Sequence, residues 1–274
     1  MTVVISPGFV LGPEQVSDLS LPRILYDDVF ADGTISATTS DTDAQAANVA
    51  DGLTWDYWRP TVLPARLEVT LDEVREADYC MVAAHDLSTS GASVRAQYHD
   101  GTTWQDAFDE QLLGTDDVTV FLFDKVQSTR FAVYVDSTDE SSVNPSIGVV
   151  KMGEALVVPR GLPLNSRPAR FSRKTDVRPQ LSEGGLLLGR SIRREGVRFD
   201  IKLQYLDAAW VRSHLDPFIE HARTGSFGWL WHPRDYPAEV ALCWTASGSE
   251  DIRPEYANLQ DRMNVTISVE GVIR

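Results

Sequence analysis

The sequence predicts a mainly β chain in which an N-terminal β-sandwich is followed by a smaller α+β unit. Between residues 65 and 135, apolar and alternating runs recur at short intervals, separated by Gly, Asp and Ser. Only one later segment, which begins at Asp207, has the signals of a convincing helix. Residues 1–150 hold 7 Lys and Arg against 25 Asp and Glu, a net charge of −18, whereas residues 151–274 hold 18 against 15, a net charge of +3. We therefore place the sandwich in residues 1–155 and the second unit in residues 156–274.

The strands of the sandwich follow from period-two patterns. Residues 66–71 alternate polar with apolar side chains, as in a half-buried strand, whereas residues 79–84 are apolar throughout and predict a strand buried on both faces. A turn is expected at His99-Asp100-Gly101. The first dozen residues contain Pro7 and Gly8, and they can join either unit. Further strands are expected over residues 93–98, 118–123 and 130–135.

Composition excludes several classes of protein. The chain of 274 residues is long enough to bury a large core, and its 24% charged and 43% hydrophobic residues are typical of a folded protein. It has no apolar run of membrane-spanning length and no visible secretory signal, so we expect a protein made in a cytoplasm. Cys80 and Cys243 are expected to be separate buried thiols. Metalloprotease, phosphate-loop, dinucleotide and serine-hydrolase motifs are absent, so the sequence predicts no enzyme, no cofactor and no metal.

Residues 160–198 are predicted to form a long basic loop. They include ten Lys and Arg residues, with prolines at positions 163, 168 and 179. Because proline cannot donate a ladder hydrogen bond, at least the first half should be a connection. A loop of this length within a compact domain is usually functional or ordered by a neighbour.

The second unit has a β-α-β-β-β pattern. A cleanly alternating strand over residues 197–203 precedes the helix, of which Asp207 is the predicted N-cap. Asp216-Pro217 should kink the helix or start a second short one, capped by Asp216, and Gly225 should end it. Further strands are expected over residues 227–231, 238–244 and 263–269.

The segment Asn-Val-Ala-Asp-Gly-Leu-Thr-Trp over residues 48–55, with Trp104-Gln105-Asp106-Ala107, resembles the discoidin or galactose-binding-like family. That family has an entry of the form A-x-DG-x-T-x-W, shortened here to DG-x-T-W. The resemblance covers roughly residues 15–155. It implies a jelly-roll sandwich that binds sugars, lipid head groups or protein surfaces through loops at one end, with a structural calcium in many members.

The strand over residues 197–205, the helix from Asp207 and the aromatic strand that leads into His232-Pro233-Arg234-Asp235 carry a second resemblance. Together they are similar to distal-tail and minor tail-tip (baseplate) proteins of long-tailed bacteriophages. The resemblance implies a tail-tube-like ring domain with one flanking helix, whose long loop or hairpin clasps the neighbouring subunit. It further implies a structural virion protein, most simply a hexameric ring, that contacts tail-tube and tail-tip hub proteins and carries an outward sandwich for host attachment.

Four residues of the sandwich are candidates for carbohydrate binding. Aromatic faces stack on pyranose rings and arginine donates forked hydrogen bonds, while a histidine at the end of a buried strand lies where binding loops occur. Trp55 is expected in the core. Asn48 and Asp51 could hold calcium, but an Asx-turn explains them without metal. The candidates for a host surface polysaccharide are Tyr57, Trp58, Arg59 and His85.

The basic segment is the candidate subunit interface. The nearest acidic surface is the N-terminal half of the same chain, so pairing between copies suits a homo-oligomer. The acidic half would repel a phosphate backbone, and we expect neither a specific nucleic acid nor a membrane as partner. A solvated loop remains the simpler alternative. The interface candidates are Arg167, Arg170, Arg173, Lys174, Arg178, Arg190, Arg193 and Arg194.

An alternative function remains open. The sandwich could be a carbohydrate-binding module attached to a small carbohydrate-active domain, or the chain could be a monomeric adhesin. A glycosidase needs two carboxylates that face each other across the bond to be cleaved. The second half supplies candidates, although each also has a structural explanation: Asp200, Asp207, Asp216, Glu220, Asp235 and Glu239.

Overall fold

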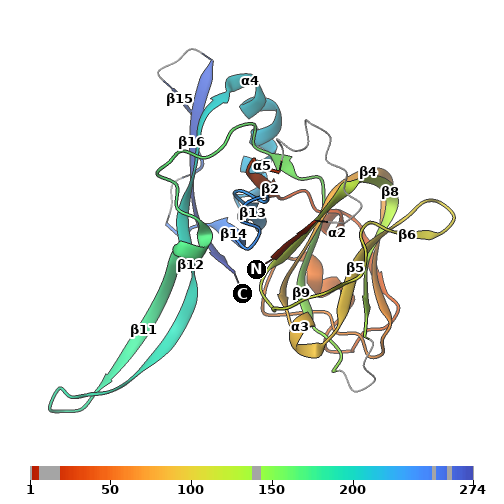
Figure 1. Cartoon of the computed structure of the whole chain (residues 1–274), viewed down its shortest axis with the longest axis horizontal. Helices are drawn as coiled ribbons and strands as arrows, with labels where there is room; N and C mark the ends of the chain where they lie inside the picture. The colour runs from red at the N-terminus through yellow and green to blue at the C-terminus, as the bar shows by residue number, and fades with distance from the viewer. Residues whose placement is uncertain (1, 6–18, 138–142, 249–250, 258–260, 274) are drawn as a thin grey trace.

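The computed structural model describes residues 2–5, 19–137, 143–248, 251–257 and 261–273. Their strands form two eight-stranded sheets that lie side by side (Figure 1). The protein is mainly β, as predicted, and the pairing is antiparallel except between β1 (Thr2–Ile5) and β8 (Thr119–Asp136). That pairing joins the described residues of the N-terminus to the sheet of the sandwich.

The sandwich is built on two long bent strands. The sequence predicts four separate strands over residues 66–71, 79–84, 118–123 and 130–135, but the structure has only β4 (Ala65–His85) and β8 there. Register shifts after Thr70 and Ala77 bend the β4–β8 pair, which lets each strand serve both layers. One end of the pair adds β3 (Thr34–Ala37) and β5 (Ser93–His99), and the other adds β1 and β9 (Ile147–Gly153). The edge beyond β5 carries β6 (Trp104–Asp106) and β7 (Gln111–Leu112).

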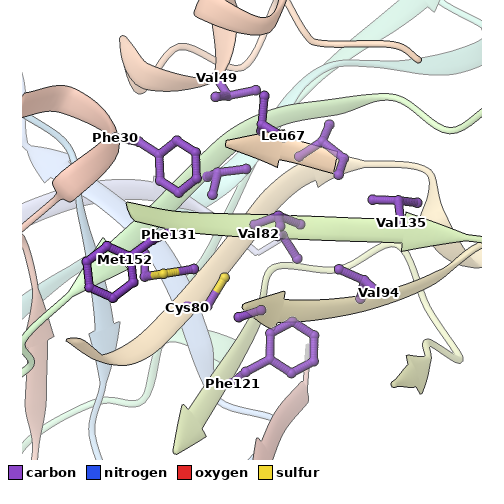
Figure 2. Close-up of a cluster of buried hydrophobic side chains, with 14 of the residues drawn as sticks. Phe30, Val49, Leu67, Cys80, Val82, Val94, Phe121, Phe131, Val135 and Met152 are labelled. Atoms are coloured by element: carbon purple, nitrogen blue, oxygen red, sulfur yellow. The ribbon is translucent and has the colours of Figure 1, made fainter. Parts of the chain in front are cut away.

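The two layers enclose one apolar core. Alternate residues of β4 and β8, such as Leu67, Val82 and Phe131, point into it, and Phe30 closes it from the short helix α2 (Val29–Asp32) (Figure 2). Two other short helical segments cover its ends, η1 (Ala46–Ala50) and α3 (Leu87–Ser90). Cys80 lies in this core and Cys243 in the second unit, both as free thiols, which confirms the prediction. Burial raises the pKa of each thiol well above its usual value.

The second sheet begins before the sandwich. Its strand β2 (Arg23–Leu25) pairs with β10 (Leu156–Val157) on one side and with β13 (Phe227–Leu230) on the other. The chain thus leaves this sheet, builds the sandwich and returns. A Cβ atom on Gly153 would collide with the Asp27 carbonyl oxygen, so the end of β9 passes close to the segment that follows β2. Beyond β13 the order is β14 (Val240–Thr245), β16 (Arg262–Val272), β12 (Leu187–Asp207) and β11 (Arg173–Leu181), with β15 (Glu255–Tyr256) on β16.

One helical segment flanks this sheet, as predicted. Asp207 is its N-cap and accepts hydrogen bonds from the backbone N–H groups of Ala209 and Trp210, at 2.9 and 3.2 Å. The segment runs through α4 (Ala208–Trp210), a π-helical turn η3 (Val211–Leu215) and α5 (Asp216–His221). A short α-helical segment does begin at Asp216 with Pro217 in its first turn, as predicted, but the predicted cap is wrong, because Leu215 is the N-cap and no side chain caps this start. No helix in the described residues is both long and apolar enough to cross a bilayer.

The predicted loop over residues 160–198 is only partly a loop. Its first third is a connection with the short η2 (Ala169–Phe171), whereas β11 and the first part of β12 pair as a hairpin. Pro179 does not prevent this, because β11 is the edge strand of the sheet and a missing N–H is tolerated there. We call residues 173–196 the arm. The arm extends away from the rest of the molecule in Figure 1.

Polar groups occupy the junction between the two units. Lys151 and Asp28 form a buried ion pair with an N–O distance of 3.1 Å. Asp78 accepts a hydrogen bond from the backbone N–H of Ala155 at 2.8 Å, and burial raises its pKa to about 6. An apolar cluster lies beside them and includes Tyr79 and Leu242 from the two sheets. The sandwich and the second sheet therefore share a packed boundary.

Candidate functional site

Two of the four predicted sugar-binding residues are part of the interior. Trp58 is fully buried, and its indole N–H donates to the Thr39 carbonyl oxygen at 3.1 Å. His85 is buried as well, and its Nε2 lies 3.0 Å from the Asp117 carbonyl oxygen. Desolvation lowers the pKa of His85, so the ring is neutral near pH 7. Neither ring has a face that a ligand could reach in this structure, so Trp58 and His85 support the fold of the sandwich.

Tyr57 and Arg59 lie together and are half-buried. The Arg59 guanidinium stands 4.9 Å from the centre of the Tyr57 ring. Its Nε and one terminal nitrogen donate to the Ser146 hydroxyl at 3.1 and 2.8 Å. The backbone of Ile147 pairs with Trp58 and with His85, so the structure brings all four predicted residues around one strand end. Only Tyr57 and Arg59 reach the surface there.

The preceding loop, residues 51–55, contains a residue that sequence reasoning assigned wrongly. Trp55 was expected in the core, but 76% of its surface is exposed. The Asp51 carboxylate accepts the Leu53 N–H at 2.8 Å, which confirms the Asx-turn, and Gly52 has a φ of +72°. The described residues contain no group of three His, Cys, Asp or Glu side chains arranged to hold a metal.

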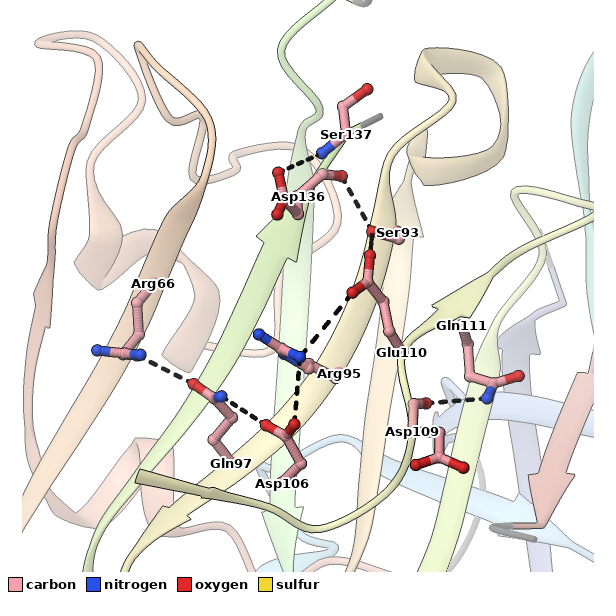
Figure 3. Close-up of polar contacts among 10 residues, drawn as sticks. All are labelled: Arg66, Ser93, Arg95, Gln97, Asp106, Asp109, Glu110, Gln111, Asp136 and Ser137. Atoms are coloured by element: carbon pink, nitrogen blue, oxygen red, sulfur yellow. Dashed lines mark hydrogen bonds and ion pairs between the residues drawn. The ribbon is translucent and has the colours of Figure 1, made fainter. Parts of the chain in front are cut away.

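A second polar cluster covers the outer face of the sandwich (Figure 3). Arg66, on β4, lies 4.7 Å from the centre of the Trp104 ring and donates to Gln97 at 3.0 Å. Gln97 donates in turn to Asp106 at 2.6 Å, and Arg95 pairs with the same carboxylate at 3.1 Å. The charges in this cluster compensate one another, and guanidinium groups already occupy the aromatic faces. Its geometry favours a rigid sheet surface.

The arm is exposed on both of its faces. All nine residues of β11 are exposed, and before Val197 strand β12 has β11 as its only ladder partner among the described residues. Aliphatic side chains form cross-strand pairs along it, Val177 with Ile192 and Leu181 with Leu187. Their exposed fractions range from 42% to 64%. An apolar surface of this kind, interleaved with charges, is typical of an interaction site.

The root of the arm carries a charge cluster. The carboxylate of Glu270, on β16, is largely buried, and three cations surround it: Lys174 at 3.4 Å, Arg198 at 3.4 Å and Arg194 at 3.8 Å. These contacts tie the base of the hairpin to the sheet. Two of the predicted interface residues thus have partners within their own chain.

The other predicted interface residues fall into two groups. Arg170 and Arg173 line a cleft of about 940 Å³ between the two units, together with Asp116 and Asp117 of the sandwich. Arg167 lines a smaller pocket beside Arg198. The last three are exposed on the arm and form no ion pair with any described residue: Arg178, Arg190 and Arg193.

No known protein-family model matches this sequence, and no curated protein is similar to it. Among solved structures, the family 32 carbohydrate-binding module from C. perfringens NanJ in complex with galactose is similar at 16% identity and a TM-score of 0.38, over 48% of this chain and 98% of the module. A chitosan-binding module from Paenibacillus sp. IK-5, in complex with chitotriose, gives 12% identity and a TM-score of 0.40, over 46% and 100%.

The structure of SpGH29 matches over 52% of this chain but only 31% of its own, at 16% identity and a TM-score of 0.40. These similarities cover about half of the chain. The strand pairing and the enclosed core of the structure confirm a β-sandwich, and its galactose-binding-like character stays a prediction. The resemblance of the C-terminal unit to phage tail proteins stays a prediction.

Proposed function

We propose that this protein is a non-catalytic assembly protein that joins copies of itself through the arm and presents the sandwich outward as a saccharide-binding module. The observation that supports this is the exposed arm. A two-stranded hairpin is only marginally stable without a third strand or a packed face. This one presents aliphatic pairs to solvent and has a free edge strand. A neighbouring surface that covers it removes both costs.

The proposed neighbour is a second copy of this chain. The arm holds six basic residues against three acidic ones, while residues 1–150 have a net charge of −18. An arm that crosses onto an acidic sandwich therefore gains from charge complementarity as well as from apolar burial. Such a contact joins two different surfaces, and it closes into a ring when the rotation between copies divides a full turn.

The proposed setting is the tail tip of a long-tailed bacteriophage. A sheet with one flanking helix and a projecting hairpin supports this, since these are the parts that the sequence resemblance implies. In this setting the ring is hexameric, contacts tail-tube and hub proteins, and the sandwich meets a host surface polysaccharide. Antibodies against the chain should label one end of the tail on virions of the encoding phage. Virions that lack the chain would contradict this setting.

Assembly itself is tested by electron microscopy of the purified full-length protein. Closed rings of one symmetry are expected, with the sandwich as a lobe on the outside. The matched control replaces residues 176–193 with a short Gly-Ser turn, which leaves the Glu270 contacts of Lys174 and Arg194 in place. Rings that persist without the arm would contradict the proposal.

A carbohydrate-active second unit is the competing function. Glu239 favours it most, because it is largely buried and desolvation raises its pKa, as in a general acid. Its carboxylate, however, accepts a hydrogen bond from the Trp231 indole N–H, which is a structural role. Polysaccharide turnover that disappears on Glu239→Gln or Asp235→Asn would establish the enzyme. We expect no turnover from the unsubstituted protein.

A further inference from the structure

A pocket lies at the seam between the loop 51–55 of the sandwich and the turn that follows the flanking helix. Its volume is about 470 Å³, which is sufficient for one or two sugar rings. Trp55 and Thr54 line it from the sandwich, and Thr224, Ser226 and Trp244 line it from the second unit. Pockets at the boundary of two units are common ligand sites.

The loop that carries the exposed Trp55 begins with a defined turn at Asp51 and Gly52. The Asx-turn at Asp51 fixes the start of the loop, and the left-handed conformation of Gly52 directs it toward the second unit. A Cβ atom on Gly52 would lie 2.4 Å from the Ser226 hydroxyl oxygen, so the two segments are in close contact. The indole of Trp55 thus stands beside the pocket on a supported loop, and it makes no ring or cation contact with the described residues.

The polar groups around the indole match a saccharide. One oxygen of Asp51 accepts the Leu53 N–H, which leaves the other to accept from sugar hydroxyls. The exposed Thr224 hydroxyl both donates and accepts. The face of an exposed indole stacks on the CH groups of a pyranose. This combination differs from the outer-face cluster, in which Arg66 already occupies the Trp104 ring.

The charges near the pocket select among saccharides. Arg223 also lines the pocket, but it pairs with Glu220 at 2.9 Å and lies near Asp251. Asp251 itself pairs with Arg253 at 3.8 Å, so with Asp51 included three acidic groups stand against two basic ones. A sugar acid is therefore repelled, while a neutral sugar is accepted and an amino sugar is attracted.

We propose that the pocket lined by Trp55, Thr224 and Trp244 is a saccharide site that takes neutral or amino pyranoses stacked on Trp55. This inference rests on the proposed saccharide-binding role and specifies its location and ligand class. It assigns the stacking contact with the sugar to Trp55 and not to Tyr57 or Arg59. The Arg59 guanidinium is already engaged within the protein, because it donates hydrogen bonds to Ser146.

The test uses the full-length protein on an array of neutral, amino and acidic glycans, followed by titration of galactose, chitotriose and trigalacturonate. Trp55→Ala should lower the affinity for the best neutral or amino ligand at least tenfold, about 1.4 kcal/mol, and Trp55→Phe should retain part of it. Phe171→Ala is the matched control, since that ring is 75% exposed and outside the pocket. It should bind like the unsubstituted protein.

Each outcome separates the two proposals. Binding that is lost in Trp55→Ala while the mass in solution is unchanged supports the site. Loss of binding in Tyr57→Ala but not in Trp55→Ala keeps a saccharide-binding protein and overturns this site. Binding of trigalacturonate alone, or of no glycan on the array, overturns the proposal, and so does a Trp55→Ala variant whose only defect is in self-association. Ring formation is tested separately, by the variant in which residues 176–193 are replaced.

Discussion

The two parts of strand β12 differ in almost every physical respect although they are continuous in the chain. From Val197 onward the strand pairs with β16, and alternate residues such as Ile201 and Leu203 are buried beneath the helix. Before Val197 it pairs with β11 alone, and residues such as Ile192 are exposed. The covered part stabilises this chain. The uncovered part carries exposed aliphatic pairs that none of the described residues covers, and the proposed function assigns their cover to a second copy of the chain.

Substitutions at matched apolar positions should give the largest contrast. Leu203→Ala should lower the free energy of unfolding by about 2–5 kcal/mol, because it leaves a cavity in a packed core. Ile192→Ala should change the unfolding free energy of the monomer by no more than about 0.5 kcal/mol. Urea unfolding at low protein concentration measures both. Similar losses would show that the arm is packed within its own chain.

The pH dependence of the free energy of unfolding should show a smaller effect, and it separates folding from self-association. Burial raises the pKa of Asp78 from 3.8 to about 6, so the folded protein holds a proton that the unfolded chain has already released. The stability that this group contributes is complete below pH 3.8 and is lost as the pH rises through about 6. Its size is on the order of 1–3 kcal/mol.

Asp78→Asn should remove that dependence, since its side-chain oxygen can still accept the Ala155 N–H. The variant should therefore gain stability over the unsubstituted protein at pH 7.5 but not at pH 3.5, as measured by urea unfolding. Self-association through the arm should not follow the same pH dependence. An equal gain at both pH values would rule out titration of Asp78 as its cause.

The charges of the arm should produce the smallest effect per residue. Arg190→Glu with Arg193→Glu should weaken self-association roughly tenfold, about 1.4 kcal/mol, and leave the unfolding free energy almost unchanged. Analytical ultracentrifugation across a range of protein concentrations gives the dissociation constant. Arg253→Glu, an exposed position away from the arm, is the control. An equal effect from the control would attribute the change to net charge.

Sequence periodicity predicted most of the fold for identifiable reasons. The alternating residues of β4 and β12 and the N-cap at Asp207 depend on neighbours close in the chain. It did not predict that β4 and β8 are continuous, because the bend arises from register shifts between strands. Nor did it place β2 in the second sheet, since a pairing of Ile24 with Leu156 and Trp229 spans the whole sandwich.

The candidate sites were predicted less well than the fold. Pro179 led to the prediction of a loop, because proline cannot donate a ladder hydrogen bond to a neighbouring strand. In the structure it lies on the edge strand β11, where no such bond is needed. Which strand forms the edge depends on the complete sheet and cannot be inferred from local sequence. The aromatic residues 55–58 indicated a surface loop, but Trp55 and Trp58 exchanged their expected roles. The Asx-turn at Asp51 was predicted correctly, but it did not by itself show that Trp55 is exposed. The sequence did not predict that residues 222–226 lie across the pocket from this loop, because the two segments are far apart in the chain.

Self-assembly through the arm is tested by the mass of the protein in solution, measured by light scattering after size-exclusion chromatography at low and high salt. One discrete multimer that dissociates as salt rises is expected, because salt screens the contact between the basic arm and an acidic sandwich. The variant without residues 176–193 should be a folded monomer under all conditions. A full-length protein that is monomeric at every concentration, or a multimer that does not depend on the arm, would contradict assembly through the arm.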